Sequence, residues 1–166
     1  MKKYYLLYIV ALLSFSAFCQ ENDKSTYYLI RHAEKDRSDT TNKNPDLTIK
    51  GQERAIKWSQ VLSKFGIEAV YSTNYNRTLQ TGKPTADDNS LTIKTYHPFK
   101  IDMEAFRKET NGKNVLIVGH SNTTAAFANK LIGKDAYPEI KDDNNANLYI
   151  VTVEGEKISH VLIKMK

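Results

Sequence analysis

The sequence has 166 residues, a formal net charge of +5, four histidines and one cysteine. This length suits a single domain with one core, once an N-terminal segment is set aside. The cysteine, Cys19, lies near the N-terminus, so the rest of the chain has no disulfide framework, thiol nucleophile or cysteine metal site. The sequence has no basic block and no basic patch interleaved with aromatic residues, so no nucleic-acid partner is predicted.

Residues 1–19 have the pattern of a secretory signal peptide. Lys2 and Lys3 precede an apolar run that is too short for a membrane span, and small residues follow it. Cleavage after Cys19 would leave residues 20–166 as a single domain. A lipid anchor on Cys19 is the alternative, but Phe18 is bulky where such sites favour a small residue. Both interpretations predict export, to a bacterial periplasm or surface.

The first elements of the domain follow a short flexible leader at residues 20–25. Thr26–Arg31 is a near-continuous apolar run, typical of a strand that is buried on both faces. A polar loop without periodicity follows. Thr48 is then a candidate N-cap for a helix over Gly51–Phe65, which carries its apolar residues on one stripe. Gly66 is placed to end that helix.

Shorter elements occupy the middle of the chain. Ile67–Tyr71 is the expected second strand, followed by a short helix that begins near Asn74 and ends before Pro84, with a turn after it. Leu91–Tyr96 is the expected third strand. Asp102–Thr110 is a short helix closed by an Asn-Gly pair.

The last elements complete an alternating pattern. Val115–Val118 is the expected fourth strand, and a helix over about Asn122–Ile132 follows it, with Gly133 at its end. After a loop, Leu148–Val153 and Lys157–Lys164 indicate a hairpin. Strands that alternate with helices predict an α/β fold. We expect a three-layer α/β/α sandwich around a mostly parallel sheet, without a large cap.

Four basic residues with chemistry in common lie near the ends of predicted strands: Arg31, His32, Arg77 and His120. The carboxyl ends of parallel strands meet at one edge of a sheet, where ligands bind. A neutral imidazole can attack phosphorus, and guanidinium groups bind phosphate oxygens in pairs. Each residue alone has an ordinary structural explanation, as a hydrogen-bonding histidine or a solvated arginine. Together they indicate a phosphoryl-transfer site.

Four sequence elements resemble the histidine phosphatase superfamily, in the branch that contains phosphoglycerate mutase and small SixA-like phosphatases. They are RHAE at Arg31–Glu34, LTIKGQERA at Leu47–Ala55, YSTNYNRTLQT at Tyr71–Thr81 and VLIVGHSNT at Val115–Thr123. They occur in the family's order across most of the domain. The resemblance implies a phosphoglycerate mutase-like fold.

The resemblance also implies roles for individual residues. His32 would be the nucleophile that carries the phosphoryl group, and Arg31, Arg77 and His120 would complete the phosphate pocket. The Thr48–Gly51 segment is expected to be structural, as a helix cap and a close packing contact. Neither a metal nor another cofactor is implied.

The chain departs from the family pattern at the general acid. Relatives often supply a glutamate after the third strand, within a motif that is absent here. His97, Asp102 and Glu104 lie in the equivalent region, and Asp102 is placed first among them. Ala33 replaces the usual glycine and Asn74 a common proline, and both are expected to have small effects.

Three further residues are candidates for phosphate contacts: Lys35, Ser38 and Asn122. Lys35 and Ser38 follow the predicted nucleophile closely, although solvated loop positions explain them as well. The identity of the substrate is open: it is predicted to be a phosphorylated small molecule or a phosphoprotein.

The leading functional hypothesis is an exported, metal-independent phosphatase that hydrolyses phosphomonoesters, or protein-borne phosphate, through a phosphohistidine on His32. A non-catalytic module that binds phospho-ligands on the same fold is the alternative. A phosphomutase is a weaker one, because mutases need a covered site and a glycolytic role fits poorly with export. The histidines are scattered without ligand spacing, so no metal site is predicted.

Overall fold

A computed structural model describes residues 24–165, so the predicted signal peptide at 1–19 lies outside the described part. This part contains one six-stranded sheet in the order β3-β2-β4-β1-β5-β6. The strands are β1 (Lys24–Arg31), β2 (Ala69–Thr73), β3 (Ile93–Tyr96), β4 (Asn114–Gly119), β5 (Asn147–Glu154) and β6 (Lys157–Lys164). The first four strands run parallel, and β5 pairs antiparallel with both β1 and β6.

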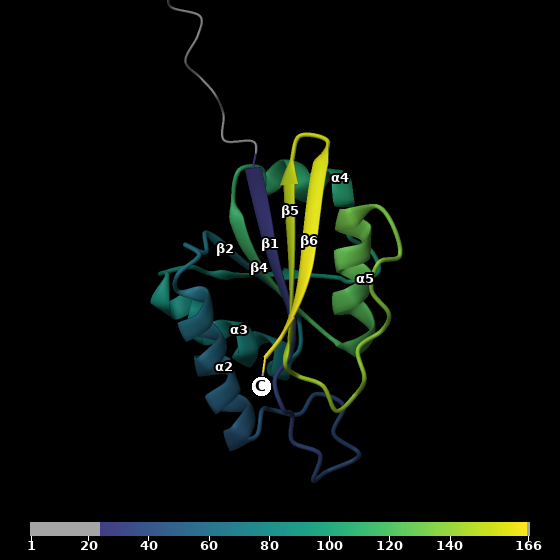
Figure 1. Ribbon diagram of the computed structural model, residues 1–166. Coiled ribbons are helices and arrows are strands. Elements are labelled where there is room, and N and C mark those ends of the chain that lie inside the picture. Colours follow the sequence, from purple (N-terminus) through teal and green to yellow (C-terminus); the bar gives the residue numbers. More distant parts are fainter. Residues whose placement is uncertain (1–23, 166) are drawn as a thin grey trace, which may run out of the picture.

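Helices cover both faces of this sheet, as Figure 1 shows. They are α2 (Ile49–Leu62), α3 (Asn76–Asp88), α4 (Met103–Glu109) and α5 (Ser121–Ile132). One core joins α2 and α3 to one face through Trp58, Leu62 and Ala86. The other core joins α4 and α5 to the opposite face through Phe106 and Phe127. The predicted three-layer α/β/α sandwich is confirmed, and none of the helices within residues 24–165 is long and apolar enough to cross a membrane.

Local signals explain where two helices begin and end. The Thr48 side chain accepts a hydrogen bond from the backbone N–H of Gly51 and caps α2, as predicted. Gly133 adopts φ 81° at the end of α5, a left-handed conformation that glycine takes without strain. The predicted apolar stripe of α2 is buried at Ala55 and Leu62, whereas Phe65 lies beyond the helix and is partly exposed.

Two of the predicted boundaries that differ from the structure concern β2 and α3. Strand β2 spans Ala69–Thr73, two residues later than predicted, because its register places Ala69 opposite Val115 of β4. The shift places Thr73 at the carboxyl end of the strand. Helix α3 continues through Pro84 to Asp88. A proline removes one backbone hydrogen bond, and the burial of residues on both sides of Pro84 outweighs that loss.

Candidate active site

A cavity of about 810 Å³ opens at the carboxyl ends of the parallel strands. Its lining residues come from five segments: 31–35, 73–77, 95–99, 120–123 and 139–142. Arg31, His32, Arg77 and His120 all line it, so the structure brings together the four residues that the sequence singled out. Their chemical roles remain predictions.

The fold explains why these four side chains meet. Arg31 ends β1, and the backbone N–H of His32 donates to the carbonyl of Gly119 at the end of β4, 2.9 Å away. His120 follows Gly119 as the N-cap of α5. Arg77 lies in the first turn of α3, which follows β2. Three adjacent parallel strands therefore deliver their next residues to one edge of the sheet.

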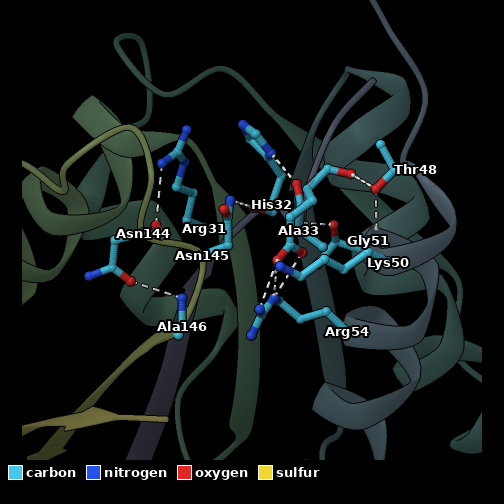
Figure 2. Close-up of polar contacts among 12 residues, drawn as sticks. Arg31, His32, Ala33, Thr48, Lys50, Gly51, Arg54, Asn144, Asn145 and Ala146 are labelled. Atoms are coloured by element: carbon cyan, nitrogen blue, oxygen red, sulfur yellow. Dashed lines mark hydrogen bonds and ion pairs between the residues drawn. The ribbon is translucent and has the colours of Figure 1, made fainter. Parts of the chain in front are cut away.

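The His32 imidazole is buried, and its Nδ1 lies 2.7 Å from the carbonyl oxygen of Ala33 (Figure 2). A carbonyl only accepts, so Nδ1 carries the proton and Nε2 keeps its lone pair. Burial lowers the pKa of His32 to about 3, and the positive charge of Arg31 adds to this effect. At neutral pH His32 is therefore a neutral imidazole, the form that a nucleophile requires.

His120 faces His32 across the cavity, with 5.5 Å between the ring centroids. Its Nε2 lies 2.8 Å from the hydroxyl oxygen of Thr73, and this hydroxyl donates its own proton to Thr78 at 3.0 Å. The Thr73 oxygen is then an acceptor for an N–H at Nε2. Burial lowers the pKa of His120 to about 4, and the positive charges of Arg77 and Arg31 contribute in the same direction. Thr73 thus orients the second imidazole.

The Arg31 guanidinium is almost fully buried and is held by the loop before β5. Its Nη1 donates to the carbonyl oxygens of Lys141 and Asn144 at 2.9 and 3.2 Å, and its Nη2 pairs with Asp142. Burial alone would raise the pKa of Asp142, but hydrogen bonds from Arg31 and Arg37 lower it on balance. Asp142 is therefore ionised beside the cavity.

Arg77 differs from Arg31 because much of its guanidinium makes no contact with a protein acceptor. Its Nε and Nη1 are buried without a hydrogen-bond partner among residues 24–165, and so is the Nε of Arg31. The guanidinium of Arg77 packs over the ring of Tyr75, 4.5 Å from the centroid. A buried N–H without an acceptor is costly. An anion in the cavity would supply acceptors for both arginines.

The other predicted residues divide into two groups. His97, Lys35 and Asn122 line the cavity. Asp102, Glu104 and Ser38 are not among its lining residues. Asp102 caps α4 by accepting from the backbone N–H of Glu104 and Ala105 at 3.0 and 3.1 Å. Of the three candidates for the general acid, His97 is the one placed at the cavity.

Among the lining residues that the sequence does not predict, three have side chains that can take part in the chemistry: Thr73, Glu139 and Asp142. Thr73 lies within one of the family-like elements, and a correct strand boundary would have pointed to it. Glu139 and Asp142 lie in a loop whose sequence has no periodicity. The two acidic side chains that line the cavity therefore come from a different part of the chain than expected.

Contacts from the α2 region and from the loop before β5 fix the turn after β1 (Figure 2). The carbonyl of Glu34 accepts from the backbone N–H of Thr48 at 2.9 Å, and Arg54 donates to both oxygens of the Glu34 carboxylate at 2.7–2.9 Å. The Asn145 side chain donates to the carbonyl oxygen of His32 at 2.7 Å. These contacts hold the backbone of the predicted nucleophile from two sides.

Acid is expected to destabilise the fold through the two cavity histidines. The pKa values of His32 and His120, about 3 and about 4, lie below the ordinary value of 6.5. Below pH 6.5 the unfolded chain therefore binds protons that the folded chain does not, and stability falls as the pH drops toward 4. For His32 the slope approaches about 1.4 kcal/mol per pH unit.

Urea unfolding at pH 7 and pH 5 measures this effect. The double variant His32→Asn, His120→Asn should lose less stability between the two pH values than the wild type. The variant His160→Asn, with an exposed histidine, is the matched control and should behave as the wild type. Equal losses in the double variant and the wild type would contradict the prediction.

Comparisons with known proteins give a matching sequence profile and a shared fold. A sequence profile described as "Histidine phosphatase superfamily (branch 1)" matches residues 27–100, which include Arg31, His32 and Arg77. No curated protein matches the sequence.

Several solved structures share the fold at low sequence identity. The protein histidine phosphatase SixA complexed with tungstate has a TM-score of 0.67 and 16% identity, over 84% of this chain and 96% of that chain. Mycobacterial glucosyl-3-phosphoglycerate phosphatase Rv2419c with inorganic phosphate has a TM-score of 0.62 and 16% identity, over 84% and 95%. YhfR from Bacillus stearothermophilus has a TM-score of 0.61 and 16% identity, over 81% and 94%.

At these identities the solved structures show a shared fold, and the sequence profile shows a family likeness over residues 27–100. The phosphoglycerate mutase-like fold predicted from the sequence is confirmed. The chain is therefore similar to the histidine phosphatase superfamily in sequence over residues 27–100 and shares its fold with the solved structures.

Proposed function

We propose that this protein hydrolyses phosphate monoesters through a phosphohistidine on His32, without a metal ion. The observation that carries the proposal is a set of buried N–H groups without an acceptor among residues 24–165, at Nε and Nη1 of Arg77 and Nε of Arg31. They lie beside a neutral imidazole, His32, with a free Nε2 lone pair. Phosphate oxygens suit the arginines, and phosphorus is a suitable electrophile for the imidazole. The names of two structural neighbours, SixA and Rv2419c, also denote phosphatases.

The reaction would have two steps. In the first, the Nε2 lone pair of His32 forms a bond to phosphorus, the ester P–O bond breaks, and the leaving oxygen keeps the electron pair and takes up a proton. In the second, water attacks phosphorus, loses a proton, and the P–N bond breaks to restore the lone pair. Arg31, Arg77 and His120 would stabilise the negative charge on the phosphoryl oxygens in both steps.

Trapping the intermediate separates this function from a non-catalytic binding module. We expect a phenyl phosphate labelled in its phosphate group to label the protein when the reaction is quenched without acid. The label should be lost in acid, survive alkali and locate to the peptide that contains His32. Phosphate binding without labelling would favour the module. Return of the label to a second alcohol, in place of release as inorganic phosphate, would favour a mutase.

A further inference from the structure

The cavity extends well beyond the space that a phosphate group fills. Its volume of about 810 Å³ falls in the range of sites that enclose a drug-sized ligand. Arg31, His32, Arg77 and His120 come from the ends of β1, β2 and β4 and the residues that follow them. The leaving group of a substrate would therefore lie against the residues that line the rest of the cavity.

One wall of that remaining space is aromatic. Tyr75 lies between β2 and α3, and His97 and Phe99 lie just after β3. The two segments are neighbours because β2 pairs with β3. The His97 and Phe99 rings are 6.1 Å apart at an interplanar angle of 64°. This arrangement offers ring faces and edges on one side of the space beside the phosphate pocket.

The Phe99 side chain is unusually exposed for its type. Its relative exposure is 71%, and that of Tyr75 is 41%. Water contact on a large apolar ring is unfavourable, and a planar aromatic ligand that covers it would be stabilised by burial and by ring–ring contact. Because Phe99 lines the cavity, such a ligand can make this contact while its phosphate lies between the arginines.

The acidic side chains of the cavity also favour a substrate with an aromatic leaving group. A general acid must hold a proton before the ester bond breaks. Asp142 is paired with Arg31 and Arg37 and is ionised, so it holds none. Glu139 lies at an exposed position of the lining, and His97 is the one general-acid candidate from the sequence that lines the cavity. A leaving group that departs as a stable anion depends least on such a donor, and phenols leave as phenolates more readily than alkyl alcohols do.

We propose that the site prefers aryl phosphate monoesters, with the aromatic ring of the leaving group held against Phe99 and Tyr75. This inference rests on the proposed function, because it names the substrate class of the same site. In the first step the P–N bond to His32 forms as the P–O bond to the ring breaks. The phenolate keeps the electron pair and takes its proton from solvent. A free aryl phosphate and a phosphotyrosyl side chain share this chemistry.

Binding of non-hydrolysable phosphonates tests the preference without turnover. Calorimetry should show that the wild type binds phenylphosphonate more tightly than methylphosphonate. The preference is the dissociation constant of methylphosphonate divided by that of phenylphosphonate. In Phe99→Ala this ratio should fall by about two- to tenfold, with methylphosphonate affinity unchanged. The ratio for Phe99→Leu should lie between those of the wild type and Phe99→Ala. Phe65→Ala is the matched control, since Phe65 is also partly exposed but is not a lining residue of the cavity, and it should keep the wild-type ratio.

Equal affinities for the two phosphonates in the wild type, or an unchanged ratio in Phe99→Ala, would overturn the aryl preference. Phosphate release from other monoesters would still stand in that case, so the two failures are distinguishable. The turnover rates of phenyl phosphate, a phosphotyrosyl peptide and a phosphoseryl peptide then show whether the aryl phosphate is a small molecule or part of a protein. Faster turnover of phenyl phosphate than of the phosphotyrosyl peptide assigns a small molecule, and the reverse order assigns a protein. If the phosphoseryl peptide is hydrolysed as fast as both, the inference is wrong.

Discussion

The variant His32→Ala is expected to lose phosphatase activity on phenyl phosphate by a factor on the order of 10⁴ or more. The reason is that no other side chain at the cavity can take its place. His120 also faces the cavity, but its Nε2 is engaged by the hydroxyl of Thr73, and His97 lies at an exposed position of the lining. Without Nε2 of His32 the covalent route is closed, and the arginines alone can bind phosphate but cannot form an intermediate. Steady-state kinetics with purified protein measures the loss.

Two controls make this result specific. His160→Ala removes an exposed histidine that hydrogen-bonds to Tyr137 and should retain wild-type kcat. Inorganic phosphate should still bind to His32→Ala in calorimetry, because Arg31 and Arg77 remain, and this would show that the pocket is intact. A variant that keeps most of its activity would remove His32 from the role of nucleophile and leave the fold assignment untouched.

Much of the site could be predicted because it depends on a simple rule of topology. Arg31, His32 and His120 directly follow apolar runs, and parallel strands bring such positions to one edge of a sheet. Arg77 follows the same rule through the first turn of a helix. Each prediction needed only the approximate end of a strand, so errors of one or two residues did no harm.

The remaining parts of the site depend on contacts that have no sequence period. Thr73 was missed because β2 was placed two residues too early, and only its pairing with β4 fixes the register. Glu139 and Asp142 reach the cavity because an irregular loop is anchored: the Ile140 backbone N–H donates to the carbonyl of Ser121. Asp102 shows the reverse case. It has the right chemistry in the expected region, and its carboxylate caps a helix.

Gly51 provides the second prediction with a large effect, on stability and activity together. A Cβ added at Gly51 would lie 2.2 Å from the carbonyl oxygen of Glu34, far inside van der Waals contact. That carbonyl is backbone, and it is held by hydrogen bonds from Thr48. The backbone of Glu34 would have to move. Gly51→Ala is therefore expected to destabilise the fold by about 2–4 kcal/mol in urea unfolding.

Helix propensity alone predicts the opposite sign. Alanine in place of glycine stabilises a helix by about 1 kcal/mol, and Gly51 lies inside α2. Gly66→Ala is an informative control, because Gly66 has φ 58° and its added Cβ would meet nothing within 4 Å. That variant carries only the cost of a left-handed backbone, about 1 kcal/mol, and should keep wild-type kcat/KM.

The effect on activity follows from the distance along the chain. Glu34 lies two residues after His32, so a displaced Glu34 backbone also shifts the imidazole relative to Arg77 and His120. We expect kcat/KM of Gly51→Ala to fall at least tenfold even where the variant is fully folded. A Gly51→Ala protein that is more stable than the wild type would show that the turn after β1 relaxes freely. In that case the contact between α2 and Glu34 would not be what holds the predicted nucleophile in place.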